Sequence, residues 1–198
     1  MLLKRVFDIV FSILAIVLLT PLLLFICILV KLDSQGPILY KQLRVGQYNK
    51  DFEIWKFRTM YSNSDSNKTL TIGNNDSRIT KLGYYLRKYK LDELPQLFNI
   101  VKGDMSFVGP RPELRKYVNY YSASDLVVLQ VKPGLTGLAS LKYKNEPELL
   151  KASENPEHYY IKTILSDKLN YNKQYVKTRS FLLDLKIISS TIFSVFFK

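Results

Sequence analysis

Two adjacent carboxylates, Asp92 and Glu93, lie where a helix is expected to begin, within the segment Leu91–Leu97. One interpretation is structural: Asp92 caps the helix, Glu93 complements its dipole, and Pro95 is tolerated in the first turn. The other is catalytic, because the free amides of a helix N-terminus bind phosphate oxygens and keep a carboxylate ionised. One carboxylate could then be a nucleophile and the other a metal ligand. The residues alone leave both interpretations open.

A second candidate for chemistry is Arg111, which stands between two prolines. Proline restricts the backbone, so the guanidinium is aimed before a ligand binds, and its planar fork suits phosphate oxygens. A solvated surface turn is the alternative interpretation. Arg87 and Lys56 are two further cations that could bind phosphate, although each taken singly is also explained as a surface charge.

The composition limits the chemistry that the chain can use. The 198 residues carry 29 Lys and Arg against 17 Asp and Glu, a net charge of +12. This excess favours an anionic partner such as a nucleic acid, a phosphorylated substrate or a membrane surface. Cys27 and His158 are the single cysteine and histidine, which excludes a disulfide framework, a Cys/His zinc site and a Cys–His nucleophile pair. Catalysis must therefore use carboxylates, lysine, arginine, hydroxyls or a bound metal.

Residues 9–30 form a stretch of 22 uncharged, mostly apolar residues. A helix of this length reaches roughly 33 Å, enough for a hydrocarbon core of about 30 Å. Basic residues on both sides make the charge bias indecisive for its orientation. Pro21 removes the hydrogen bond to the Val17 carbonyl and predicts a kink, while the Thr20 hydroxyl could bind the Ile16 carbonyl. A re-entrant helix and a kinked membrane span are both consistent with this pattern.

After this membrane segment, residues 33–198 are expected to form one small domain of the α+β class, mainly helical. Two strands, 38–45 and 52–57, are expected to pair as a hairpin, and a polar surface loop follows at 62–77. The apolar tail, 181–198, is either a core helix or an amphipathic helix in the membrane interface. Four helices are expected, at 79–90, 92–102, 113–131 and 159–185.

Together these residues resemble a known family, the monotopic polyprenyl-phosphate phosphoglycosyltransferases, also called the bacterial sugar transferases. The resemblance covers nearly the whole chain, in the family's order, and is most specific from Leu91 to Pro112. The matching stretches are Lys4–Asp8, Lys56–Met60, Leu91–Leu97, Lys102–Pro112 and Lys132–Gly137.

The resemblance implies transfer of a phosphosugar from a UDP-sugar to undecaprenyl phosphate, with release of UMP and formation of a polyprenyl-diphosphate sugar. This would be the first membrane step in the assembly of a glycoconjugate such as a capsule, an O-antigen, an exopolysaccharide or a glycoprotein glycan. The resemblance also implies the site. Asp92 would be the covalent nucleophile, Glu93 a ligand of Mg²⁺, and Arg111, Arg87 and Lys56 would hold phosphate oxygens.

The resemblance further implies a location for the enzyme. Residues 1–32 would form a re-entrant membrane anchor, with Thr20-Pro21 at the break, where the family often has Ser-Pro. Residues 33–198 would form the catalytic domain on the cytoplasmic face of the bacterial inner membrane. Interfacial amphipathic helices would contact anionic lipids there. The chain looks like the family's minimal single-domain form, and a homo-oligomer is compatible with it.

One departure from the family pattern concerns the choice of substrate. Members that act on acetamido sugars often carry Asn-Gly-Arg-Asn after the Gly137 motif, whereas this chain has Lys142-Tyr143-Lys144-Asn145. The identity of the sugar therefore stays open, while the reaction does not. A nucleic-acid binder would also explain the charge, but the sequence has no evident recognition helix or aromatic platform, so nucleic acid is not expected as a partner. A non-catalytic membrane scaffold would leave the placement of the two carboxylates and the arginine to chance.

Overall fold

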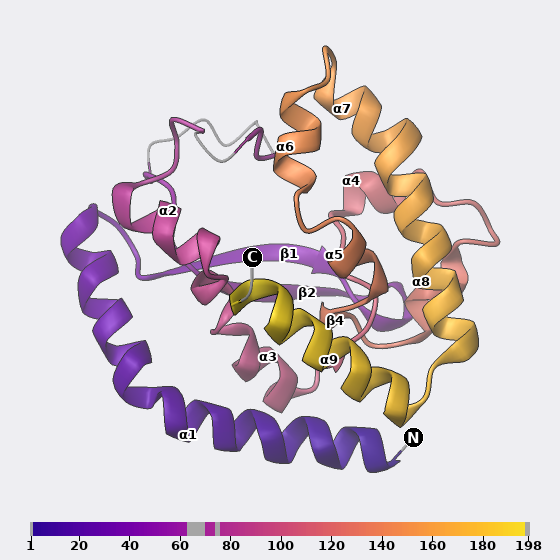
Figure 1. Cartoon of the computed structure of the whole chain (residues 1–198), viewed down its shortest axis with the longest axis horizontal. Helices are drawn as coiled ribbons and strands as arrows, with labels where there is room; N and C mark the ends of the chain where they lie inside the picture. Colours follow the sequence, from indigo (N-terminus) through magenta and orange to yellow (C-terminus); the bar gives the residue numbers. More distant parts are fainter. Residues whose placement is uncertain (1, 63–69, 74–75, 197–198) are drawn as a thin grey trace.

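The computed structural model describes residues 2–62, 70–73 and 76–196, so much of the predicted polar loop at 62–77 lies outside the described residues. Its longest element is the N-terminal helix α1, Leu2–Asp33, which Figure 1 shows as two straight parts that meet at a bend. Pro21 lies inside α1, and Thr20 Oγ1 donates a hydrogen bond to the Ile16 carbonyl at 2.7 Å. The kink and the compensating hydroxyl bond predicted from the sequence are both present.

Much of the surface of α1 is apolar and exposed. Within the described part of the chain, α1 is the one helix long and apolar enough to cross a membrane. Its outward-facing apolar side chains include Leu14, Val17, Leu18, Phe25 and Leu32. An apolar surface this extensive is rare on soluble proteins and indicates an interaction with a membrane or another protein.

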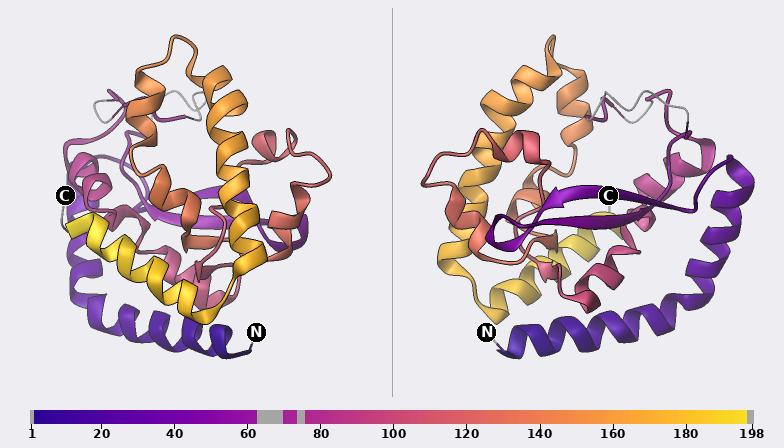
Figure 2. Two further views of the ribbon diagram at one scale, coloured as in Figure 1. Left: turned by 45° about the vertical axis from the view of Figure 1, so that its right-hand side comes forward. Right: turned by 180° about the vertical axis from the view of Figure 1, so that it is seen from behind.

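The predicted hairpin is confirmed. Strands β1, Leu39–Val45, and β2, Asp51–Phe57, pair antiparallel with Leu39 opposite Phe57 and Val45 opposite Asp51. The connecting turn takes Tyr48 and Asn49 through positive φ angles of 57° and 60°. The hairpin runs through the middle of the molecule in both views of Figure 2 and presents Lys56 near the end of β2.

The helix expected at 79–90 is present as α2, Lys81–Lys88, and Thr80 Oγ1 caps it by accepting from the Gly83 amide at 2.9 Å. The predicted start of the helix at 92–102 is wrong. Residues Leu91–Glu93 form a separate 3-10 turn, η2, and helix α3 spans Gln96–Lys102. Lys90, at φ 58°, reverses the chain before the turn. The interpretation of Asp92 as the helix cap is therefore also wrong.

A pair of short parallel strands was not predicted. β3, Ser106–Val108, pairs with β4, Gly134–Thr136, with Ser106 opposite Gly134 and Val108 opposite Thr136. Gly134 is required by this contact, because a Cβ atom there would lie 2.1 Å from the Gly109 nitrogen. The pairing brings the chain after β3, which carries Arg111, back against the middle of the fold.

The prediction of a single helix at 113–131 is wrong. The structure has a short helix α4, Arg115–Val118, and a 3-10 helix η3, Leu126–Gln130. The side chain of Asp125 explains the interruption, because its Oδ2 accepts from the Ser122 amide at 2.9 Å and the Ser122 hydroxyl at 2.6 Å. Such local side-chain bonds offer the backbone an alternative to the helix.

The expectation of mostly helical structure at 159–185 is confirmed, with an interruption near 179–180. A π-helix, Tyr160–Leu165, leads directly into α8, Ser166–Thr178. Ser180 Oγ then accepts from the Leu183 amide at 3.1 Å at the start of α9, Phe181–Phe196. Three short helices precede them: α5, Leu138–Lys142; α6, Glu146–Lys151; and α7, Pro156–Tyr159, on which His158 is exposed.

Helix α9 has two apolar faces. One is buried around Ile187, which packs with Val108 and Tyr175. The other exposes Leu182 and Phe193. α9 is therefore a packed helix that also retains an outward apolar surface, which combines features of both alternatives drawn from the sequence.

Helix α1 is fastened to the rest of the fold near both of its ends. Arg5 Nη1 donates to the Ile100 carbonyl in the last turn of α3 at 2.7 Å. Arg58, just after β2, donates to the Val30 carbonyl in the last turn of α1 at 3.0 Å. Arg58 thus donates to a carbonyl at the C-terminal end of α1, and Arg5 adds a second donor to the Ile100 carbonyl, which also accepts from the Gly103 amide. The apolar anchor and the elements that carry the candidate site therefore form one packed body.

Candidate active site

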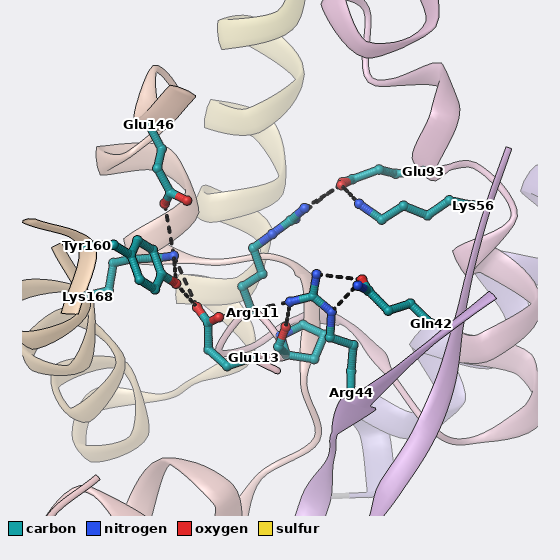
Figure 3. A network of polar contacts seen from close by, with 10 residues as sticks. Gln42, Arg44, Lys56, Glu93, Arg111, Glu113, Glu146, Tyr160 and Lys168 are labelled. Atoms are coloured by element: carbon teal, nitrogen blue, oxygen red, sulfur yellow. Dashed lines mark hydrogen bonds and ion pairs between the residues drawn. The ribbon is translucent and has the colours of Figure 1, made fainter. Parts of the chain in front are cut away.

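Three of the predicted site residues meet at one point, Glu93 (Figure 3). Lys56 Nζ, from β2, lies 2.7 Å from Glu93 Oε1, and Arg111 Nη2, from the loop after β3, lies 2.5 Å from the same oxygen. Arg111 Nη1 adds a longer contact of 3.4 Å to Glu93 Oε2. Strand β2, the 3-10 turn and the proline-flanked loop thus each supply one charged group. We call these three residues the Glu93 clamp.

Burial sets the electrostatics of the Glu93 clamp. Burial alone would raise the pKa of Glu93, but the charges of Arg111 and Lys56 hold that pKa well below its ordinary value. The Lys56 ammonium has a lowered pKa because burial outweighs the attraction of Glu93. The charge of Glu93 raises the pKa of Arg111, whose side chain stays 32% exposed. The clamp therefore holds an ionised carboxylate beneath an arginine that solvent can still reach.

Asp92 adjoins the clamp but has a different environment. Its side chain is only 7% exposed, and its Oδ1 has no hydrogen-bond partner among the described residues. Burial raises the pKa of Asp92; Lys56 opposes this shift and Glu93 adds to it. Because a 3-10 turn has about three residues per turn, neighbouring side chains point roughly 120° apart. The turn thus directs the two adjacent carboxylates differently: Glu93 is held by two cations, whereas Asp92 Oδ1 has no hydrogen-bond partner among the described residues.

Arg87 lies beside the carboxylates and outside the Glu93 clamp. Its Nε donates to Thr59 Oγ1 at 2.9 Å and its Nη1 to Thr71 Oγ1 at 3.2 Å. Burial lowers the pKa of Arg87, and the charge of Asp92 opposes that shift. Arg87 therefore contributes positive charge to the surroundings of Asp92. Thr20 and Pro21 belong to the bend of α1 and act there on the backbone.

A second charged cluster next to Arg111 was missed by the sequence analysis (Figure 3). Its centre is Glu113, which accepts from the Tyr160 hydroxyl at 2.8 Å and from Lys168 Nζ at 3.1 Å. Lys168 Nζ also lies 2.9 Å from Glu146 Oε2. Glu113 could have been suspected from its place directly after Pro112. Lys168 gave no such signal, because it is one of several lysines in a polar helix.

Magnesium needs few protein ligands, since it keeps several waters and is held by one or two carboxylates plus substrate phosphates. Among the described residues, no group of three or more His, Cys, Asp or Glu is placed to hold a metal ion by itself. Within the described part of the chain, Glu93 Oε2 makes only the longer 3.4 Å contact with Arg111. Glu93 could therefore supply the single protein carboxylate that a magnesium–diphosphate site requires.

Comparison with known proteins identifies relatives over the whole chain. The sequence profile of the family described as "Bacterial sugar transferase" matches residues 1–198. The chain is 38% identical, over 99% of its length, to the UDP-glucose:undecaprenyl-phosphate glucose-1-phosphate transferase of Klebsiella pneumoniae. It is 36% identical, over 96% of its length, to the UDP-N-acetylgalactosamine-undecaprenyl-phosphate N-acetylgalactosaminephosphotransferase of Aeromonas hydrophila. The chain spans 40% and 42% of these two relatives. A third relative, the UDP-glucose:undecaprenyl-phosphate glucose-1-phosphate transferase of Caulobacter vibrioides, is 38% identical over 96% of this chain and 68% of its own length.

Proposed function

Because this chain belongs to the bacterial sugar transferase family, we propose that it transfers a sugar phosphate from a UDP-sugar to undecaprenyl phosphate and releases UMP. The donor is proposed as the UDP-sugar class, since the relatives carry the names of enzymes for UDP-glucose and UDP-N-acetylgalactosamine. The product would be a polyprenyl-diphosphate sugar for polysaccharide or other glycoconjugate assembly.

The observation that carries this proposal is the contrast between the two neighbouring carboxylates. Glu93 is held by Lys56 and Arg111, whereas the buried Oδ1 of Asp92 has no partner within the described structure. A nucleophile must be oriented and yet not already committed to a cation. Asp92 meets both conditions, and the chain's single cysteine and single histidine lie elsewhere, in α1 and α7.

We propose two chemical steps. An Asp92 carboxylate oxygen first bonds to the phosphorus that bears the sugar, the bond from that phosphorus to the bridging oxygen breaks, and UMP departs with the electron pair. A phosphate oxygen of undecaprenyl phosphate then bonds to the same phosphorus. The aspartyl–phosphorus bond breaks, which regenerates the Asp92 carboxylate and yields the diphosphate-linked sugar.

Electrostatic repulsion is the main barrier that the site must lower. Two like unit charges 4 Å apart repel by about 4 kcal/mol at an effective dielectric constant near 20, and the attacking carboxylate faces at least two negative charges. Arg111 is the clamp cation most exposed to a ligand, and Lys56 and Arg87 add positive charge around Asp92. Fixed cations stabilise charge that develops on the leaving group.

Magnesium is the proposed cofactor, held by Glu93. When bound, it would neutralise charge on the diphosphate and assist departure of UMP. Lys56 keeps Glu93 in place from the β2 side, and Arg111 approaches the same carboxylate from the opposite loop. The chain's own residues therefore orient the carboxylates before a substrate binds.

We also propose that the enzyme sits on the cytoplasmic face of the bacterial inner membrane, with α1 re-entrant. Pro21 within α1, the bend in Figure 1 and the basic residues near both helix ends support this placement. The exposed apolar faces of α1 and α9 would enter the lipid, and Lys and Arg side chains would meet anionic headgroups.

The test is UMP release from a panel of UDP-sugars in the presence of undecaprenyl phosphate and Mg²⁺. Wild-type protein should release UMP with at least one donor, and Asp92→Asn should lose turnover by orders of magnitude. Asp51→Asn is the matched control, because Asp51 is a half-exposed partner of Arg115 at the hairpin tip. Absence of UMP with every donor would contradict the proposed reaction.

Mass spectrometry separates the covalent route from direct attack. Protein mixed with UDP-sugar and Mg²⁺ but without lipid should gain one phosphosugar mass on the peptide that contains Asp92. Turnover close to wild type in Asp92→Asn would contradict the covalent route and favour attack by the lipid phosphate in a ternary complex.

A further inference from the structure

The proline-flanked loop carries two opposite charges that serve different partners. Arg111 contacts Glu93, whereas Glu113, two residues later, points toward α8 (Figure 3). The Glu113 side chain is only 8% exposed, so it needs a counter-charge inside the protein. Arg111 is close enough to feel its field and would be one source of that charge. Something must therefore keep Glu113 from competing with Glu93 for Arg111.

We propose that Lys168 is a positioning residue for the phosphate-binding Arg111. By neutralising Glu113, Lys168 leaves the Arg111 guanidinium free to serve Glu93 and the phosphate of the substrate. The inference rests on the proposed function, because it assigns Arg111 to a substrate phosphate.

The contacts of Lys168 fit this role. Its side chain is only 6% exposed, and lysines are rarely buried to this degree unless they are paired with an anion. The ammonium has three donors and three acceptors in reach: Glu113 Oε1 at 3.1 Å, Glu146 Oε2 at 2.9 Å and the Tyr160 hydroxyl at 3.2 Å. The Tyr160 hydroxyl itself donates to Glu113 at 2.8 Å. Lys168 is thus the main counter-charge of Glu113.

Arg44 cannot replace Lys168 in this role. Its Nη1 lies 4.0 Å from Glu113 Oε2, too far for a hydrogen bond. The guanidinium is already held by Gln42 Oε1, at 3.0 and 2.8 Å, and by the Pro112 carbonyl at 3.1 Å. Arg44 therefore mainly fixes the backbone of the loop and adds positive charge near Glu113, while Lys168 donates directly to the carboxylate.

The π-helix explains how Lys168 and Tyr160 reach one carboxylate. Residues eight apart in a regular α-helix point about 80° away from each other. The wider turn at Tyr160–Leu165 rotates less per residue and reduces that angle. The same turn leaves Lys168 stacked 5.0 Å above the Tyr160 ring. Such π-helical turns often occur at functional sites. Here the turn places the side chains of Tyr160 and Lys168 against Glu113.

The experiment measures UMP release by wild type, Lys168→Met and the double variant Lys168→Met/Glu113→Gln. Loss of a charged hydrogen bond predicts that Lys168→Met raises KM for the UDP-sugar, or lowers kcat/KM, by about 10- to 100-fold. Glu113→Gln removes the competing charge, so the double variant should recover to within about fivefold of wild type. Lys173→Met is the matched control, on the same helix in a half-exposed pair with Asp125, and should keep wild-type kinetics.

The outcomes are distinguishable. Wild-type kinetics in Lys168→Met would overturn the inference, and so would a double variant no better than the single one, since a purely structural role gives no charge rescue. If Lys168→Met does not fold, Tyr160→Phe replaces it in the same cycle, because it keeps the ring packed on Tyr117 and removes one donor to Glu113. Absence of UMP release by the wild type would contradict the proposed function and, with it, the assignment of Arg111 to a substrate phosphate.

Discussion

Lys56 Nζ lies 2.7 Å from Glu93 Oε1, an ion pair that joins the end of strand β2 to the 3-10 turn between α2 and α3. Both side chains are largely buried, and Arg111 shares the same carboxylate oxygen. A buried carboxylate with two cationic partners holds three separate segments of the chain in one place. The position of Asp92, the preceding residue in the same 3-10 turn, depends on that attachment.

Replacing Glu93 with Gln should therefore lower both stability and activity. The change leaves Lys56 and Arg111 without their carboxylate, and removal of one partner of a buried pair costs on the order of 3 kcal/mol. Activity should fall, with a higher Mg²⁺ concentration needed for half-maximal UMP release. Glu53→Gln is the control: Glu53 is exposed on β2 and lies 3.5 Å from Lys41, so its loss should cost less than about 1 kcal/mol. Equal melting temperatures for the two variants would contradict the role of the clamp.

Replacing Asp92 with Asn should abolish turnover and stabilise the fold. The buried Oδ1 of Asp92 has no partner in the described part of the chain, and Glu93 lies next to it. Keeping the Asp92 carboxylate ionised therefore costs folding free energy. A neutral amide of the same shape removes that cost. A gain of about 1 kcal/mol corresponds to roughly 2–4 °C in melting temperature for a protein of this size. Thermal unfolding of the purified variant in detergent measures the shift. A clear decrease in melting temperature would contradict the unfavourable buried environment assigned to the Asp92 carboxylate.

The sequence predicted those parts of the fold that depend on local patterns. The polar turn between two short strand segments predicted the β1–β2 hairpin, and the helical spacing of apolar residues predicted α2. The helix expected at 113–131 failed because Asp125 bonds to Ser122, a turn that apolar periodicity does not register. The β3–β4 pair was missed because it joins three-residue strands from distant parts of the chain.

The same distinction applies to the candidate site. Asp92, Glu93 and Arg111 stand out in short motifs, and Lys56 belongs to a strand that the sequence located. Lys168 could not be found in this way. Its pairing with Glu113 spans 55 positions of the chain and depends on tertiary packing and on the π-helix before α8.

Glu113 should make the stability of the protein depend on acid pH. Burial tends to raise its pKa, but Lys168 and Arg44 outweigh burial and hold the pKa below the ordinary value of 4.5. A carboxylate whose pKa is lower in the folded state stabilises the fold above its unfolded pKa, and this contribution is lost as pH falls through the folded value. The melting temperatures of wild type and Glu113→Gln should therefore differ at pH 7 and converge as the pH falls below about 4.5. A difference that stays constant down to pH 3 would contradict the ionised state assigned to Glu113.

Replacing Pro21 with Leu should change the topology of α1. Leucine restores the amide that can donate to the Val17 carbonyl, which straightens the helix and lets part of the population span the membrane.

In a Cys27→Ser background, single cysteines at Leu2 and at Ser77 report the two sides of the anchor in intact spheroplasts. With Pro21 present, an impermeant maleimide should label neither position. With Pro21→Leu, position 2 should become labelled while position 77 stays protected. Leu24→Ala changes an exposed apolar side chain in the same helix and should leave the pattern unaltered. Labelling of position 2 from outside in the protein that retains Pro21 would establish a true span and contradict the re-entrant anchor.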